Sequence, residues 1–516
     1  MKVQNDSLKS HRIASNTLVL FIRIFILTII NLYMVRLILQ GLGEVDYGIF
    51  NTIAGVVTAT SVLSGVMALS IQRYYSYAMG QKDPKRLQEI FSTSICLLSA
   101  LSIIIIIALE TFGLWFVNTQ LLIPADRLHA TLWIYQFSIF ILVCSIIQIP
   151  YTAAIFSHED MGIYALISTI ECLLKLFAAY CIVLTTSDKL IFYVAGLLAI
   201  AIIIMVMYAI IGSIRYKECH FRKPNDRKLL KDLLSFSGWT LFGSLASTAM
   251  LQGNTILLNV FYGPIIVAAF GIALQINNAF NALCSSMVLA FRPPMIKSYA
   301  NGDHEYLNQL FSACNKFIFY ILIAIAIPII ANMDVILEIW LDKATSNMVL
   351  FSRLIIIYIL ILAMHSPITI IMQASGHIKE YHLPVESITL LCLPLTWILF
   401  RFQLPAYSVF ISMIAVCLVA HVIRLVCLRH FYMPFSIKEY TLSFAFPALS
   451  ILVLSSLALY QISHHIESSL YLFSVSFLGI PAIVFSLAYL FGINTKERYV
   501  IKDMLQPILS KLICQK

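Results

Sequence analysis

The chain alternates long apolar stretches with short polar ones, and the apolar stretches have the length of membrane-spanning helices. A spanning helix needs about 20 apolar residues. About fourteen stretches meet this requirement. They run over residues 17–39, 48–71, 93–117, 131–155, 162–185, 189–212, 236–260, 264–289, 313–333, 347–372, 384–401, 406–428, 441–462 and 468–491. Prolines interrupt the pattern around 380–405, so the ends of that stretch are the hardest to place.

The polar segments between these stretches contain an internal repeat. SYAMGQKDPKRLQEIFS begins at Ser76, and SYANGDHEYLNQLFS begins at Ser298. The sequence P-x-T begins at Pro150 and again at Pro367, each followed by a tyrosine at the same distance, Tyr164 and Tyr381. The two copies of each repeated sequence are roughly 220 residues apart. Long internal repeats are typical of transporters in which two similar helix bundles rock about a central site.

The repeat predicts an all-α membrane protein of two parallel six-helix lobes and two extra helices. An even number of helices in each lobe means that both lobes enter the membrane from the same side. The expected divisions are an N-terminal lobe at 1–212, a basic linker at 213–235 and a C-terminal lobe at 236–430. Helices thirteen and fourteen then occupy 431–493, and a basic amphipathic tail occupies 494–516.

Composition supports lipid as the solvent for this chain. Of its 516 residues, 60% are hydrophobic and 11% charged, and the mean hydropathy is +0.90. With a cytoplasmic N-terminus, about 26 of the 34 Lys and Arg residues fall in cytoplasmic segments. We therefore expect both termini in the cytoplasm. The net charge of +9 follows from this topology and gives no reason to expect a nucleic-acid partner.

Polar side chains recur at helical spacing on three of the predicted spans. The stripes comprise Asn51, Gly55, Thr58, Ser61, Gly65 and Gln72; Ser244, Thr248, Gln252, Thr255 and Asn259; and Gly271, Gln275, Asn278 and Ser285, with Arg292 beyond. Amides in hydrocarbon need partners, so these faces should meet a neighbouring helix or water. Helix packing through small and polar residues is one reading. A polar cleft lined by spans one, two, seven and eight is the other.

Charges inside the predicted spans are functional candidates, because they are costly in lipid. Glu171 and Lys175 have i,i+4 spacing, which suits either a self-neutralising pair or a gate or coupling site. The other in-span cations are Arg23, Arg36 and Arg353, of which Arg36 and Arg353 could reach the headgroups instead. Arg73 lies at the end of the second predicted span, where it is either a positively charged anchor at the membrane surface or a gate residue. Cations outnumber the in-span acids Glu110 and Glu171, which favours an anionic substrate.

Enzyme signatures are absent from the sequence. It contains no H-E-x-x-H, G-x-S-x-G, D-D-x-x-D or G-x-x-x-x-G-K-[ST] motif. Its eleven cysteines include no C-x-x-C, so neither a zinc site nor a disulfide framework is expected. We therefore expect a protein that is not an enzyme, with no cofactor and no metal.

Six segments carry a family resemblance. They are EVDYGIFN at 44–51, QRYYSYAMG at 72–80, IPYTAAIFSHEDM at 149–161, FSGWTLFGSLA at 236–246, QGNTILLNVFYGP at 252–264 and KSYANGD at 297–303. The chain resembles Wzx-like flippases, the O-antigen and capsule exporters of the superfamily that also holds the multidrug and toxin extrusion (MATE) transporters.

The resemblance implies flipping of an undecaprenyl-pyrophosphate-linked oligosaccharide across the inner membrane by alternating access, without ATP hydrolysis. It implies membrane lipids and other polysaccharide assembly proteins as partners. It also implies cations in the central cavity, for which Arg23, Lys175 and Arg353 are the candidates. The polar residues expected beside them are Asn51, Gln252, Asn259, Gln275 and Asn278. Gate or coupling roles are expected for Glu171, Lys175, Arg36 and Arg73.

Two other functions remain open at this point. A cation-coupled exporter of drugs or other small molecules would use H⁺ or Na⁺ and an essential acid in the membrane. Glu171 is the deep candidate, but pairing with Lys175 argues against its free titration. A glycan polymerase or transferase is disfavoured by the parallel repeat and by the absence of large outer loops.

Overall fold

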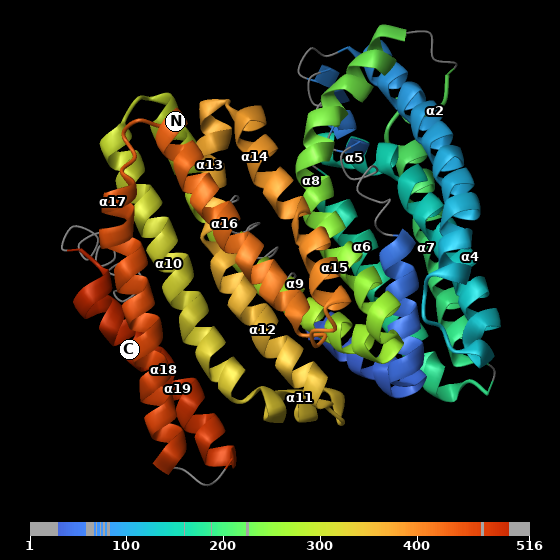
Figure 1. Cartoon of the computed structure of the whole chain (residues 1–516). Helices are drawn as coiled ribbons and strands as arrows, with labels where there is room; N and C mark the ends of the chain where they lie inside the picture. The colour runs from blue at the N-terminus through green and yellow to red at the C-terminus, as the bar shows by residue number, and fades with distance from the viewer. Residues whose placement is uncertain are drawn as a thin grey trace, which may run out of the picture. The chain divides into compact units, whose positions relative to one another are not determined.

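The computed structural model describes residues 29–57, 67–68, 70–72, 74–75, 78–79, 83–158, 160–186, 188–222, 227–465 and 469–494. Its elements are helices, shown in Figure 1. After the helical residues 29–57, they are α2 (Pro84–Ala108), η1 (Leu109–Gly113), α3 (Leu114–Thr119), η2 (Ala125–Arg127), α4 (Leu128–Ile147), α5 (Ile149–Ser157), α6 (Met161–Leu184), α7 (Lys189–Arg215), α8 (Arg227–Tyr262), α9 (Pro264–Ala300), α10 (His304–Ala331), α11 (Met333–Leu341), α12 (Ser346–Ala363), α13 (His365–Ser375), α14 (Ile378–Leu390), α15 (Cys392–Arg401), α16 (Ser408–Phe431), α17 (Ile437–Tyr440), η3 (Thr441–Ala445), α18 (Phe446–His465), α19 (Ser469–Leu487) and η4 (Ala488–Gly492).

The expectation of an all-α polytopic membrane protein is confirmed. Among the described residues, eleven helical stretches are long and apolar enough to cross a membrane. They match eleven of the predicted spans. The predicted span at 236–260 lies within α8. The described parts of the first two spans are the helical residues 29–57, 67–68 and 70–71.

Several helices begin earlier than the apolar pattern predicts, because the repeated polar frame is itself helical. Asp83 caps α2 by accepting hydrogen bonds from the backbone N–H groups of Lys85 and Arg86. Asp303 caps α10 by accepting from Tyr306 N–H. Such a cap contributes about 1 kcal/mol. The first repeat is therefore a capped helix start that recurs in both copies.

The second repeat marks a break in a membrane helix. α4 gives way to α5 at Gln148, just before Pro150, and α12 gives way to α13 at Met364, just before Pro367. A proline lacks the backbone N–H that a continuous helix would use, but it fits the first turn of a new one. P-x-T therefore encodes the same kink twice.

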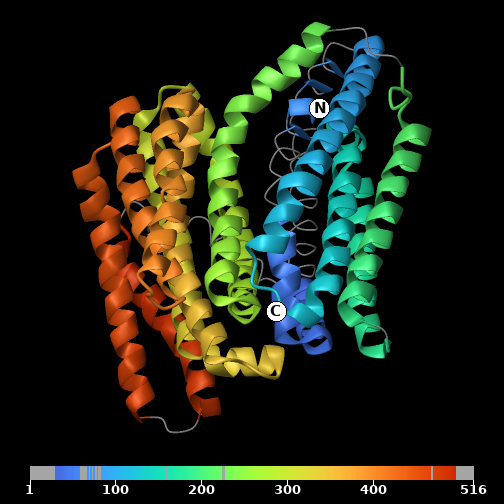
Figure 2. The same ribbon diagram turned by 45° about the vertical axis from the view of Figure 1, so that its right-hand side comes forward.

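The chain forms two compact units, each considered by itself. The first contains residues 1–272 and 389–409, and the second contains residues 273–388 and 410–516. In the first unit α7 packs against α4, α5 and α6, while α15 packs on α8. In the second unit α10 packs against α12, α18 and α19, which lie beside it in Figures 1 and 2. The lobe boundaries expected from the repeat stay a prediction.

One helix crossing in the first unit depends on a glycine. A Cβ atom built on Gly48 would lie 1.9 Å from the backbone oxygen of Pro264, the first residue of α9. Such a distance is far inside van der Waals contact. A side chain at position 48 would therefore force the helical residues 29–57 and the start of α9 apart.

We predict that Gly48→Ala lowers the apparent melting temperature of the purified protein, because overpacking against a backbone atom costs about 1–3 kcal/mol. Gly162→Ala is the matched control, since a Cβ at Gly162 in α6 meets nothing within 4 Å. Thermal unfolding in detergent measures both variants. Equal melting temperatures for Gly48→Ala and the control would contradict the close approach.

Candidate functional site

A polar seam joins the helical residues 48–55 to the segment 252–271 within the first unit. Asn259, which is fully buried, lies at its centre. Its side-chain amide donates to the Thr52 hydroxyl (3.1 Å), and its carbonyl oxygen accepts from Leu122 N–H (2.9 Å). Both ends of the Asn259 amide are thus satisfied by protein, so the residue links three segments of the chain.

Glycines allow the two sides of the seam to approach closely. A Cβ on Gly271 would lie 2.9 Å from the Asn51 amide nitrogen, and one on Gly55 would lie 3.1 Å from the Gln252 side-chain oxygen. The Asn51 amide donates to Tyr47 O in its own helix (2.8 Å). The seam therefore brings together Asn51, Gln252 and Asn259 of the predicted cavity residues, and it uses the amides of Asn51 and Asn259 in internal hydrogen bonds.

Three predicted amides are instead accessible and have no hydrogen-bond partner among the described residues. Gln252 on α8 and Gln275 on α9 are half-buried, and Asn278 on α9 is exposed. Gln275 and Asn278 fall within the candidate span Pro264–Ser285. An accessible amide in hydrocarbon without a partner is costly, so a site that exposes one is expected to hold water or a polar ligand.

Glu171 and Lys175 form the ion pair that their spacing predicts, with 2.6 Å between the Lys175 nitrogen and the carboxylate. Their side chains remain 34% and 40% exposed. The apolar residues Leu173, Phe177 and Leu184 of α6 are each more than half exposed. At about 100° per residue, the pair lies on the opposite side of the helix from this apolar stripe. The pair is therefore on the side of α6 that turns away from lipid.

The other predicted cations are placed less favourably for a cavity. In the second unit Arg353 pairs with Asp334 (2.6 Å) and donates to Ile330 O (3.0 Å), which ties α12 to the junction of α10 and α11. Arg36 is half-buried within the helical residues 29–57. Arg23 and Arg73 lie outside the described residues.

An unpredicted ion cluster joins three segments of the first unit. Arg127 donates to both carboxylate oxygens of Asp46 and to Asp188 (2.9 Å). Asp188 also caps α7 by accepting from two backbone N–H groups. Burial raises the pKa of Asp46, and the hydrogen bond from Arg127 opposes that rise. The predicted topology places all three residues at the outer face, so the cluster ties the outer loops together.

The second unit contains a buried polar cluster that the sequence did not single out. His365 and His421 stack with ring centroids 5.3 Å apart, and both are at least nine-tenths buried. Arg424 donates to the Tyr381 hydroxyl (2.5 Å), which also meets the Thr369 hydroxyl (2.9 Å). The repeated Thr and Tyr of P-x-T therefore bind each other in this copy and hold an arginine inside the membrane.

A buried acid lies next to this cluster. Glu386 on α14 is 6% exposed and contacts the His382 ring at 3.2 Å. The sequence did not point to Glu386, because prolines make the start of the span at 384–401 hard to place. It did not point to Arg424 either, because a cation near the cytoplasmic end of a span is expected from the topology alone. The signal available in the sequence was the presence of two histidines, an arginine and a glutamate inside predicted spans 10, 11 and 12.

Comparison with solved structures identifies the fold. The chain is similar to a structure described as the lipid II flippase MurJ in an inward closed conformation, with a TM-score of 0.70, 14% identity, and coverage of 92% of this chain and 99% of that one. It is also similar to an inward-facing multidrug resistance MATE family transporter of the MOP superfamily, with a TM-score of 0.67, 14% identity, and coverage of 79% and 95%. A MOP superfamily transporter from Pyrococcus furiosus matches with a TM-score of 0.56, 15% identity, and coverage of 80% of this chain and 94% of that one. The protein therefore has the MATE and MurJ fold.

The sequence itself identifies the family. Residues 13–334 match the family described as polysaccharide biosynthesis protein, and this match covers more than half of the chain. The chain belongs to that family. A comparison with curated protein sequences found no match. The resemblance seen in the sequence is thus confirmed at the level of family and fold.

The Glu171–Lys175 pair can be tested for a role beyond folding. We predict that Glu171→Gln/Lys175→Met keeps a normal membrane level and melting temperature, because removing both partners leaves no uncompensated charge. Surface glycan should nevertheless be lost if Lys175 contacts an anionic substrate. The single variant Lys175→Met serves as the comparison, since it leaves Glu171 unpaired. Normal glycan in the double variant would assign the pair to structure alone.

Proposed function

We propose that this protein flips a lipid-linked oligosaccharide, the repeat unit of a surface polysaccharide, across the cell inner membrane by alternating access. The resemblance implies undecaprenyl pyrophosphate as the lipid carrier and cytoplasmic termini. Membership of a polysaccharide biosynthesis family supports the glycan. Similarity in fold to a lipid II flippase supports a lipid-linked form of it.

The observation that carries the proposal is the set of unpartnered amides, Gln252, Gln275 and Asn278. A glycan presents many hydroxyl groups, and each loses hydrogen bonds to water when it enters the membrane. Accessible amides can donate to these hydroxyls and accept from them. They also suit a passage through which different sugars move, because they carry no fixed charge.

Accessible cations would stabilise the pyrophosphate. Lys175 lies on the side of α6 away from the apolar stripe and keeps 40% of its side chain exposed. Arg292 near the end of α9 is exposed and donates to Gln373 (2.9 Å). A phosphate group can engage either side chain as a charge-assisted acceptor. The lipid tail would stay in the bilayer while the charged headgroup crosses.

The polar seam provides a closure for alternating access. Gly48, Thr52, Asn259 and Pro264 lie at the ends of their helices that the predicted topology assigns to the outer face. The helices on the two sides belong to different copies of the repeat. When the protein opens outward, the contacts of Asn259 with Thr52 and Leu122 would break and water would replace them.

The test replaces the three amides with leucine in cells that lack the wild-type protein. We expect Gln252→Leu/Gln275→Leu/Asn278→Leu to reach the membrane normally, because none of the three amides makes a hydrogen bond to a described residue. A lost hydrogen bond of about 1–1.5 kcal/mol per amide slows crossing roughly tenfold each. Surface glycan, normalised to protein level, is the readout.

Asn118→Leu is the control, because Asn118 is an exposed amide at the far end of α3. It should leave the glycan unchanged. Full glycan in the triple variant at a normal protein level would refute the role of these amides in the passage.

Cation-coupled export of a small molecule is the second candidate, and Glu386 favours it. A carboxylate that is 6% exposed within a membrane span and contacts a histidine has the surroundings expected of a coupling-ion site. This role is also compatible with a proton-coupled flippase. A deletion strain that is sensitive to drugs but has normal surface glycan would separate small-molecule export from flipping.

A further inference from the structure

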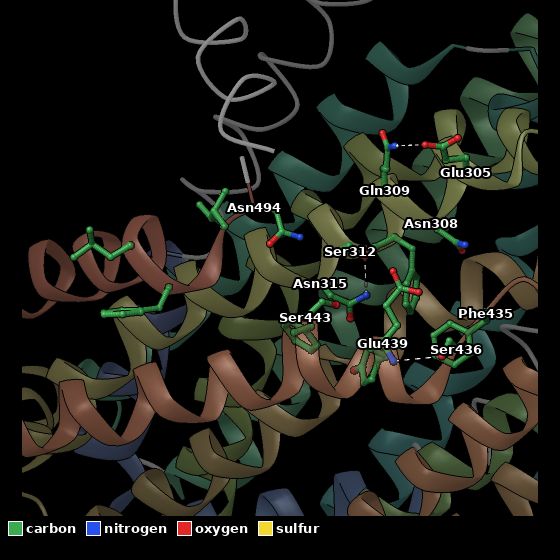
Figure 3. Close-up of a pocket in the computed structure, with 16 residues that line it drawn as sticks. Glu305, Asn308, Gln309, Ser312, Asn315, Phe435, Ser436, Glu439, Ser443 and Asn494 are labelled. Carbon is green, nitrogen blue, oxygen red and sulfur yellow. Dashed lines mark hydrogen bonds between the residues drawn. The ribbon is translucent and has the colours of Figure 1, made fainter. Parts of the chain in front are cut away.

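The second unit contains a polar pocket of its own. Its volume is about 870 Å³, and it is formed by the start of α10, the α17–η3 turn and the end of η4. Figure 3 shows the side chains that line it. The predicted topology places all three of these helix ends at the cytoplasmic face.

The lining of this pocket is suited to a cation. It contains two carboxylates, Glu305 and Glu439, and no lysine or arginine. Three of its aromatic rings form a cluster, because Phe311, Phe435 and Tyr440 have centroids 5.7–6.0 Å apart. Aromatic faces attract ammonium and guanidinium groups. The Glu439 carboxylate has no ion-pair partner among the described residues.

A buried acceptor in the lining also lacks a donor. Asn315 is 2% exposed, and its amide nitrogen donates to Phe311 O (2.8 Å). Its side-chain oxygen has no hydrogen-bond partner in the described part of the chain. An unsatisfied buried acceptor costs about 1–3 kcal/mol. A ligand with N–H donors would satisfy this oxygen and neutralise the nearby carboxylates at the same time.

We propose that this pocket binds the basic start of the chain's own C-terminal segment, with Lys496 and Arg498 as the cations. Asn494 lines the pocket and is the last residue described. Lys496 and Arg498 follow it by two and four residues, so their Cα atoms lie within about 7 and 14 Å of its Cα. Tethering at this distance gives a high effective concentration.

The bound segment would fasten three helix ends of the second unit. Arg498 presents five N–H donors in a planar fork, which suits the Glu439 carboxylate, and its flat face can stack on Tyr440. The cytoplasmic ends of α10, α17 and η4 would then be held by one strap. This inference concerns the C-terminal segment and does not depend on the substrate proposed above.

A charge-swap cycle on the full-length protein tests the proposal. We expect Glu439→Lys and Arg498→Glu each to lower the apparent melting temperature by about 2–4 °C, and the double variant to recover most of the loss. Lys496→Glu replaces Arg498→Glu in a second cycle, which identifies the cation that contacts Glu439. The control pairs Glu89→Lys with Arg498→Glu, because Glu89 occupies a comparable early turn of α2 and should show no recovery.

Accessibility gives an independent readout. Ser443→Cys lines the pocket, and its labelling by a water-soluble maleimide should be slow in the full chain and faster in a chain ending at Asn494. The proposal would be overturned if the losses in melting temperature were additive in both cycles. It would also be overturned if the truncation left the maleimide labelling of Ser443→Cys unchanged. Phosphatidylethanolamine retained equally by the full and truncated chains, and lost in Glu439→Lys, would assign the pocket to a lipid amine and also overturn it.

Discussion

The fit between Gly48 and the backbone of Pro264 is the contact on which the rest of the account depends. It allows the outer part of the helical residues 29–57 to meet the start of α9 without an intervening side chain. Only at this separation can Asn259 reach both Thr52 and Leu122. The result is a closely packed seam, where two copies of an internal repeat meet, in which the side chains of Asn51 and Asn259 are hydrogen-bonded. A transporter that alternates between two open states needs such a contact, one that is closely packed but can be rehydrated.

Polar groups inside the membrane divide into two sets by their partners. Asn259 and Arg353 donate to atoms of other segments, so their hydrogen bonds stabilise helix crossings, whereas Asn51 donates within its own helix. Gln252, Gln275 and Asn278 have no hydrogen-bond partner in the described part of the chain. Helical spacing in the sequence cannot distinguish the sets, because residues of both kinds lie on the same stripe of a helix. Only the position of the neighbouring helix decides whether an amide forms a hydrogen bond to protein or remains accessible.

Much of the fold could be predicted from the sequence. The apolar stretches gave the spans, and the repeat pointed to paired copies of the same helix start and the same proline kink. The helix starts were placed too late, since an aspartate cap allows a polar segment such as 84–92 to be helical. The Glu171–Lys175 pair followed from its spacing. The cluster around Tyr381 and Arg424 did not, because its members come from different spans and only tertiary packing brings them together.

The second unit also has both buried polar side chains and polar side chains that line an open pocket. Its histidine pair and Tyr381 lie in the interior, whereas the pocket near Asn315 opens at the ends of its helices. The charge of Arg424 is held by Tyr381 of a neighbouring helix, whereas the Nδ1 atoms of His365 and His421 and the side-chain oxygen of Asn315 have no hydrogen-bond partner in the described part of the chain. The same physical rule, that a polar atom in or near lipid must find a partner, therefore accounts for the seam, the amides and the pocket.

The most direct test of the seam as a moving closure is a reversible cross-link across it. Thr52→Cys/Asn259→Cys would place two thiols where a side-chain hydrogen bond now lies, and each single-cysteine variant controls for the native thiols. Oxidation of the double variant in cells should form an intramolecular disulfide and stop delivery of surface glycan, and reductant should restore it. Glycan delivery that continues at the normal rate with the cross-link fully formed would contradict the claim that this seam must open during transport.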